Sequence, residues 1–123
     1  MRMNLAGLKI LVVEDEFLVA SLIQDLLEDA GCVVSGPIPR LSEAIDAARA
    51  DDCDAAVLDV NLGGYRVFPV AEELSRRHIP FVIVTGYATT TLPEPFDRSP
   101  TIRKPFRNQD LLNAISNLVD CTA

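Results

Sequence analysis

The chain has 123 residues, enough for one ordinary domain, and 49% of them are hydrophobic, enough to build a packed core. Its formal net charge is −7, from 18 acidic and 11 basic residues, which argues against non-specific nucleic-acid binding because such binding requires Lys and Arg. Three scattered cysteines without CxxC spacing argue against a disulfide framework or a zinc site. No signal peptide and no apolar run of about 18 residues is visible, so we expect a cytoplasmic protein that does not enter a membrane.

Short apolar segments alternate with amphipathic ones along the chain. Continuous apolar runs at 10–13, 55–58 and 81–84 are typical of central parallel strands that are covered on both faces. The weaker segments 33–35 and 101–103 are expected at the edges of the same sheet. Apolar residues recur at helical spacing in four further segments, at 19–30, 41–48, 67–74 and 111–119.

The interval 88–100 should hold a helix if strands and helices alternate strictly. Pro93 and Pro95 instead limit any helix there to one turn or less. The order of elements therefore predicts a (βα)₅ domain, an α/β fold with a doubly wound parallel sheet and a short or degenerate fourth helix. We expect a single domain over residues 1–123 with its core at 9–118, since no linker or repeat divides the chain.

Polar side chains follow the predicted strands at the point where each strand ends. In open parallel sheets the carboxyl ends of the strands meet at one edge, and ligands bind there. The residues that follow the first, third, fourth and fifth strands are Glu14 and Asp15, Asp59, Thr85, and Lys104. We therefore expect three carboxylates, a hydroxyl and an ammonium group to converge on one site.

This set of groups suits phosphoryl transfer to a carboxylate. Neighbouring carboxylates repel one another, and a hard divalent cation relieves the repulsion; Mg²⁺ prefers such oxygen ligands, with Mn²⁺ as an alternative. An ionised Asp59 can then act as the nucleophile toward phosphorus. The cation, Lys104 and the Thr85 hydroxyl would each neutralise or hydrogen-bond one phosphoryl oxygen.

Each of these residues also has an ordinary structural explanation. The acidic pair could begin a helix, and Asp59 or Thr85 could start a turn. A lysine before a proline, such as Lys104, is usually solvated. The combination, in this order at four strand ends, favours the functional interpretation.

The motifs around these residues resemble the receiver domain of bacterial two-component response regulators. The resemblance runs from Lys9 to Leu118 and rests on four motifs, Val12-Val13-Glu14-Asp15-Glu16, Val57-Leu58-Asp59-Val60-Asn61, Val84-Thr85-Gly86 and Lys104-Pro105-Phe106. It implies a flavodoxin-like sheet with strand order 2-1-3-4-5 and a cis peptide bond between Lys104 and Pro105.

The resemblance also implies a function. A histidine kinase or a phosphotransfer protein would donate its phosphoryl group to Asp59. The domain would catalyse its own phosphorylation and dephosphorylation without being an ordinary enzyme. Mg²⁺ would be bound by Asp15, Asp59 and the backbone carbonyl of Asn61. Glu14 stands where the family more often has Asp and would contact the ion through water.

Two departures from the family pattern concern the switch that follows phosphorylation. Receivers usually place Tyr or Phe three residues before the lysine, where this chain has Thr101, and the fourth helix is broken by prolines. The segment from Pro80 to Tyr87 is similar to PFxFATGY-type receivers, a subgroup associated with HWE and HisKA2 kinases. We hypothesise that Tyr87 takes over part of the missing aromatic's role; the alternative is that it only covers the rim of the site.

Several fates remain open for the phosphoryl group. The chain ends within five residues of Leu118, so we expect a stand-alone receiver that signals by binding an unidentified partner protein, or that relays or drains phosphoryl groups. A haloacid-dehalogenase-like phosphatase would require a second Asp two residues after the nucleophile, where this chain has Asn61. A passive interaction domain would have no need of Asp15, Asp59, Thr85 and Lys104.

Overall fold

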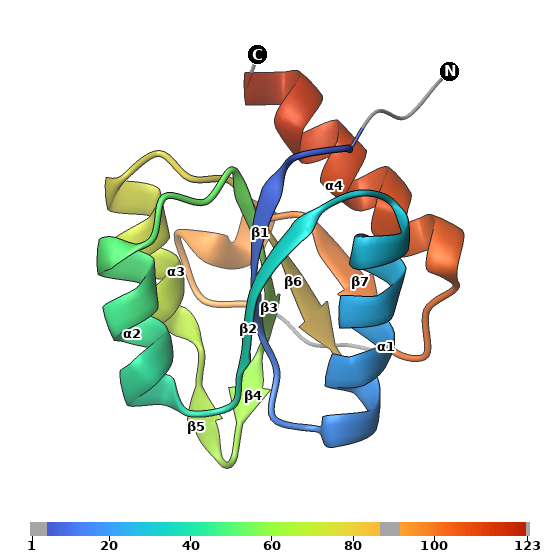
Figure 1. Ribbon diagram of the computed structural model, residues 1–123. Coiled ribbons are helices and arrows are strands. Elements are labelled where there is room, and N and C mark those ends of the chain that lie inside the picture. Colours follow the sequence, from blue (N-terminus) through green and yellow to red (C-terminus); the bar gives the residue numbers. More distant parts are fainter. Residues whose placement is uncertain (1–4, 87–91, 123) are drawn as a thin grey trace.

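The computed structural model describes residues 5–86 and 92–122. Its centre is a five-stranded sheet in which all neighbouring strands are parallel (Figure 1). From one edge to the other the strands are β2 (Val33–Ile38), β1 (Lys9–Val13), β3 (Ala55–Asp59), β6 (Phe81–Thr85) and β7 (Thr101–Arg103). Counted along the chain, these five strands have the order 2-1-3-4-5, so the predicted doubly wound α/β fold is confirmed.

Helices cover both faces of this sheet (Figure 1). α1 (Phe17–Asp29) and α4 (Asn108–Thr122) cover one face, and α2 (Leu41–Ala50) and α3 (Phe68–Arg76) cover the other. Pro69 lies in the first turn of α3, where its missing N–H removes no helical hydrogen bond. Among the described residues, no helix combines the length and the apolar character that a membrane crossing requires.

The central strands are buried on both faces, which explains their unbroken apolar runs. On β1, Leu11 and Val13 belong to the core beneath α2 and α3, whereas Ile10 and Val12 belong to the core beneath α1 and α4. The residues of β3 and β6 alternate between the two cores in the same way. Because successive side chains point to opposite faces, a strand covered on both faces is apolar at nearly every position.

The fourth crossover holds a single turn of helix in its described part. Residues 92–100 contain one 3₁₀ turn, η1 (Phe96–Arg98), as the two prolines predict. The Phe96 side chain is buried, and its ring centroid lies 5.5 Å from that of Phe68 and 6.2 Å from that of Phe81. The Phe96 ring thus joins this crossover to the core beneath α2 and α3.

A short antiparallel hairpin follows β3, and the sequence pattern did not predict it. It pairs β4 (Asn61–Leu62) with β5 (Tyr65–Arg66), and Gly63 and Gly64 join them with φ angles of 55° and 93°. Glycine adopts such positive φ angles without steric cost. Because the hairpin leaves β3 immediately after Asp59, it borders the edge of the sheet where the polar residues collect (Figure 1).

Candidate functional site

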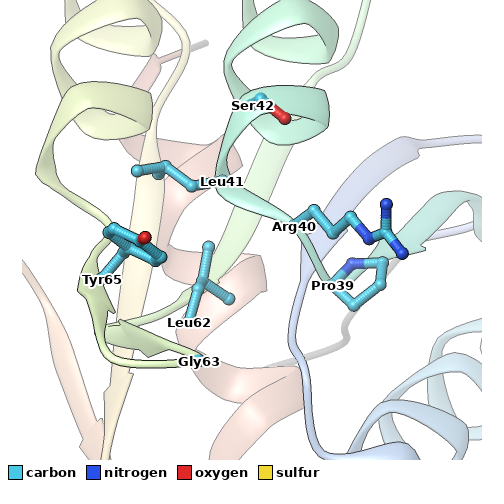
Figure 2. Close-up of a pocket in the computed structure, with 7 residues that line it drawn as sticks. All are labelled: Pro39, Arg40, Leu41, Ser42, Leu62, Gly63 and Tyr65. Carbon is cyan, nitrogen blue, oxygen red and sulfur yellow. The ribbon is translucent and has the colours of Figure 1, made fainter.

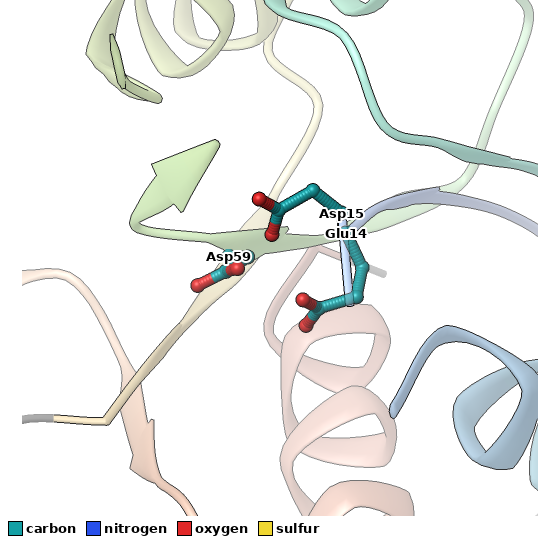
Figure 3. Close-up of side chains that lie close together, drawn as sticks. All are labelled: Glu14, Asp15 and Asp59. Atoms are coloured by element: carbon teal, nitrogen blue, oxygen red, sulfur yellow. The ribbon is translucent and has the colours of Figure 1, made fainter. Parts of the chain in front are cut away.

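Three carboxylates meet where β1 and β3 end. Glu14 and Asp15 directly follow β1, and Asp59 is the last residue of β3. One carboxylate oxygen from each residue lies within 4.8 Å of those from the other two (Figure 3). Glu14 and Asp59 are only 2% and 5% exposed, whereas Asp15 is open to solvent. The structure therefore brings together the three carboxylates that the sequence places at this edge.

Lys104 brings a positive charge to these carboxylates from the turn after β7. Its backbone N–H donates to the carbonyl of Thr85 at 2.7 Å, which holds the turn against the buried end of β6. Its Nζ lies 3.2 Å from Glu14 Oε1 and 3.6 Å from Asp59 Oδ2, so one ammonium group is shared between the two buried carboxylates. The peptide bond between Lys104 and Pro105 is cis, as the family resemblance implies.

The hairpin after β3 contacts two of the carboxylates through its backbone. The Gly63 N–H donates to Asp15 Oδ2 at 2.8 Å, and the Asn61 N–H donates to Asp59 Oδ1 at 3.4 Å. The Asn61 side chain accepts a hydrogen bond from the Gly64 N–H at 3.2 Å and so stabilises the turn. Sequence reasoning selected Asn61 but missed the contribution of Gly63. The pair of glycines just after the acceptor was the available signal, because a tight turn there exposes backbone N–H groups.

Burial controls the electrostatics of the cluster. Burial raises the pKa of Asp59 to about 8, helped by a hydrogen bond and the negative charge of Glu14, against the opposite effect of Lys104 and the Asn61 N–H. The burial of Lys104 favours its neutral form, but Asp59 and Glu14 outweigh that effect and raise its pKa. The lysine therefore stays charged, and the carboxylate cluster retains a proton near neutral pH unless more positive charge arrives.

One buried oxygen of the cluster is left unsatisfied. Glu14 Oε1 accepts no hydrogen bond from the described part of the chain, although the positively charged Lys104 Nζ lies 3.2 Å away. A buried carboxylate oxygen without a donor is costly. Asp15 and Asp59 open into a cleft of about 180 Å³, whose other lining residues are Glu16, Val60, Asn61, Gly86 and Lys104. The carboxylate oxygens of Asp15 and Asp59, with an oxygen of Glu14 within 4.8 Å of one from each, fit a hard divalent cation.

A larger hollow lies between the hairpin and the start of α2, and its lining differs from that of the cleft. It has a volume of about 470 Å³ and is lined by Pro39, Arg40, Leu41, Ser42, Leu62, Gly63 and Tyr65. Figure 2 shows Leu41, Leu62 and Tyr65 around its apolar part, with the Arg40 side chain reaching away from them. Its lining contains neither a carboxylate nor the lysine, so the smaller cleft is the candidate site.

Of the two residues considered for the switch, the structure describes Thr101, which does not line the cleft. Tyr87 lies outside the described residues. Thr101 is exposed at the start of β7, where it pairs in register with Ile83. Its hydroxyl donates to the carbonyl of Ser99 at 3.0 Å. Thr101 is therefore a surface residue of an edge strand in this structure, and its role in a switch stays a prediction.

Two curated relatives are similar in sequence to this chain over most of its length. The transcriptional regulatory protein TcrA of Mycobacterium tuberculosis is 34% identical over 90 residues, which cover 72% of this chain and 35% of TcrA. Nodulation protein W of Bradyrhizobium diazoefficiens is 28% identical over 111 residues, which cover 86% of this chain and 48% of that protein. The chain thus spans between about a third and a half of these relatives.

Solved structures and a family model give the identity of the fold and the family. SdrG of Sphingomonas melonis Fr1 is 37% identical with a TM-score of 0.81, and the match covers 92% of this chain and 97% of SdrG. The receiver domain of sensor histidine kinase PA1611 of Pseudomonas aeruginosa PAO1, solved with magnesium in its active-site cleft, shares the fold at 21% identity and a TM-score of 0.78, over 94% and 99% of the two chains. The family model of the response regulator receiver domain matches residues 10–116. This chain belongs to the response regulator receiver domains.

Proposed function

We propose that this receiver domain accepts a phosphoryl group on Asp59 in a reaction that requires Mg²⁺. The observation that carries the proposal is the meeting of three carboxylates and one ammonium group at the carboxyl edge of the sheet. Asp59 is nearly buried at that edge yet borders the cleft, as a nucleophile protected from water must. Membership of the receiver family supports the same assignment.

The oxygen atoms around Asp59 suit the ion that this reaction needs. Asp15, Asp59 and the backbone carbonyl of Asn61 would hold the ion, and Glu14 would contact it through water. Bound Mg²⁺ supplies the positive charge that keeps Asp59 ionised at neutral pH and neutralises one phosphoryl oxygen. The unsatisfied Glu14 Oε1 and the raised pKa of Asp59 support this assignment, and Mn²⁺ would fit the same ligands.

The transfer itself requires few groups from the protein. One carboxylate oxygen of Asp59 attacks phosphorus while the bond from phosphorus to the donor's histidine nitrogen breaks, and that nitrogen keeps the electron pair. Lys104, already 3.6 Å from Asp59 and held in its charged form, pairs with one phosphoryl oxygen. The Thr85 hydroxyl donates a hydrogen bond to another phosphoryl oxygen.

Hydrolysis removes the phosphoryl group again: water attacks phosphorus, the bond to Asp59 breaks, and inorganic phosphate leaves. The domain thus acts on itself and turns over no separate substrate.

The donor of the phosphoryl group is a protein. α1 begins beside the cleft, and on its first two turns Phe17 and Leu18 are each 80% exposed and Leu22 is 46% exposed. Large apolar side chains exposed beside a reaction cleft are typical of a protein-binding surface. We place the histidine kinase or phosphotransfer protein on this surface. The segment from Pro80 to Tyr87 favours a kinase of the HWE or HisKA2 type, and binding of a partner protein would carry the output.

The test is transfer of label from radiolabelled acetyl phosphate in the presence of Mg²⁺. Wild-type protein should become labelled, and Asp59→Asn should not. Asp46→Asn is the matched control, because Asp46 is an exposed aspartate on α2, and it should label as the wild type does. Label that persists in Asp59→Asn would refute the assignment. Rapid release of phosphate from many phosphate esters would instead favour a phosphatase, and no label at all would leave a passive binding domain.

A further inference from the structure

Lys104 has a third carboxylate neighbour that the acceptor chemistry does not use. Glu16 Oε1 lies 3.6 Å from Lys104 Nζ, the same distance as Asp59 Oδ2. Glu16 occupies the N-cap position of α1, yet its side chain makes no capping hydrogen bond. Its backbone N–H donates to Glu14 Oε2 at 3.1 Å, which fixes its position beside the cluster. The Glu16 carboxylate is therefore directed to the lysine instead of to its own helix.

The neighbours of Lys104 differ in their exposure to solvent. The Glu14 and Asp59 side chains are 1% and 7% exposed, the lysine side chain is 16% exposed, and the Glu16 side chain is 63% exposed. Two carboxylates thus attract the ammonium group inward and one attracts it toward the rim. We propose that Glu16 is a positioning residue that draws Lys104 toward the rim of the cleft and makes the site less receptive to small anionic phosphodonors. This inference rests on the proposed function of Asp59.

The contact between Glu16 and Lys104 is weak enough for phosphorylation of Asp59 to break it. Ion pairs with an exposed partner are weak, because water screens them and both side chains lose freedom. Glu16 therefore restrains Lys104 without fixing it, and a phosphoryl oxygen arriving at Asp59 can take the lysine over. Since Asp59 and Glu14 keep Lys104 protonated, Glu16 changes where the charge lies and not whether it is present.

Small donors are the ones most affected by such an arrangement. With acetyl phosphate, Asp59 attacks phosphorus, the bond from phosphorus to the acetyl oxygen breaks, and acetate leaves with the electron pair. This doubly charged anion must enter a cleft of about 180 Å³ whose lining includes Asp15, Glu16 and Asp59. A docked protein gains additional binding energy from its wider contact surface. Negative charge at the rim therefore discriminates against the small anion and leaves the protein donor favoured.

The test compares Glu16→Gln with Glu43→Gln. Glu43 is an exposed glutamate in the first turn of α2, so its substitution removes the same charge from another helix start. At saturating Mg²⁺, Glu16→Gln should raise the second-order rate constant for labelling by acetyl phosphate about threefold to tenfold, mainly through a lower half-saturating concentration. The gain should be smaller with phosphoramidate, which carries less negative charge. Glu43→Gln should stay within about twofold of wild type for both donors.

A second measurement reports on the lysine without any phosphorylation. In metal-free protein, the NMR resonances of the Lys104 side chain should shift in Glu16→Gln and remain in place in Glu43→Gln. Unshifted Lys104 resonances, or unchanged acetyl phosphate kinetics in a protein that labels normally on Asp59, would overturn the role of Glu16 and leave the proposed function standing. A wild-type protein that never labels would overturn the proposed function, and the NMR comparison would still decide whether Glu16 restrains Lys104.

Discussion

Two nearly buried glutamates, Glu73 and Glu14, lie in regions of opposite character. Glu73, on α3, is 9% exposed and is bound by Arg49 at 3.3 Å and Arg76 at 3.0 Å, so two positive charges serve one carboxylate. Glu14, after β1, is 2% exposed and shares one ammonium group with other carboxylates, with one oxygen unsatisfied. The seam between α2 and α3 is balanced within the chain, whereas the carboxyl edge of the sheet is short of positive charge.

A third arginine, Arg77, also has a structural role at the interface between α2 and α3. Arg77 donates from Nη1 to the carbonyls of Ala48 and Asp51, at 2.8 Å and 2.7 Å, and so satisfies the end of α2. Its second terminal nitrogen pairs with Asp52 at 3.3 Å. No comparable arrangement neutralises the carboxylates near Asp59 in the described part of the chain. This imbalance supports the proposal that a cation and a phosphoryl group complete the region around Asp59.

The largest effect is expected from removing the charge of Lys104. Lys104→Met keeps the apolar stem but leaves Glu14 and Asp59 without a counter-charge. We expect labelling of Asp59 to slow by about 100-fold or more, as when one charge-stabilising group is removed from an active site. We expect the metal-free protein to lose about 2 kcal/mol of unfolding free energy. Urea denaturation and labelling kinetics measure the two effects, and wild-type labelling in this variant would contradict the assignment.

Asp59→Asn should stabilise the metal-free protein, by about 1–3 kcal/mol at neutral pH. Burial raises the folded-state pKa of Asp59 from 3.8 to about 8, so between these values the folded state keeps a proton that the unfolded state releases. The stability that Asp59 contributes is therefore full below about pH 4 and is lost as pH rises toward 8. The gain from Asp59→Asn should grow over that range in urea denaturation without Mg²⁺. An equal gain in unfolding free energy at pH 4 and pH 8 would show that burial does not raise the pKa of Asp59.

The balanced seam should respond in the opposite way. Glu73→Gln loses its contacts with Arg49 and Arg76, whose side chains are 60% and 69% exposed, so we expect a loss of about 1 kcal/mol of unfolding free energy. Labelling of Asp59 and its dependence on Mg²⁺ should be unchanged. If Glu73→Gln slowed labelling as much as Lys104→Met, the division between a structural and a functional charge cluster would be lost.

The smallest effect concerns the hairpin that contacts Asp15. Gly63→Ala introduces a side chain at φ 55°, so we expect a cost of about 0.5–1 kcal/mol. It should also weaken Mg²⁺ binding by about twofold to threefold in calorimetry, because the Gly63 N–H no longer restrains Asp15 as well. Gly7→Ala is the control: φ is 83°, the space is equally open, and the site is distant. Equal Mg²⁺ affinity in the two variants would show that the hairpin does not restrain the site.

Sequence patterns predicted the features that depend on periodicity. β1, β3 and β6 were predictable because a strand buried on both faces is apolar throughout. The hairpin was missed because strands of two residues are too short to show any period. β2 extends to Ile38, beyond the predicted 33–35. The prediction ended too early because Gly36 and Pro37 weaken any strand pattern.

The site was predictable as a set of residues but not as an arrangement. The order of strand ends places Asp15, Asp59 and Lys104 at one edge by topology alone. Which carboxylates share the lysine depends on side-chain distances of a few ångströms, which no spacing in the sequence encodes. The contact of Glu16 with Lys104 and the unsatisfied oxygen of Glu14 likewise could be seen only in the structure.

The most direct test of the central claim is to map the modified residue. Wild-type protein is incubated with acetyl phosphate, with Mg²⁺ or with a chelator, and the peptides are analysed by mass spectrometry. We predict a phosphoryl group on the peptide that contains Asp59, at that residue, in the sample with Mg²⁺ and not in the chelated one. An unmodified Asp59 in the presence of Mg²⁺, or a phosphoryl group on any other residue, would contradict the account.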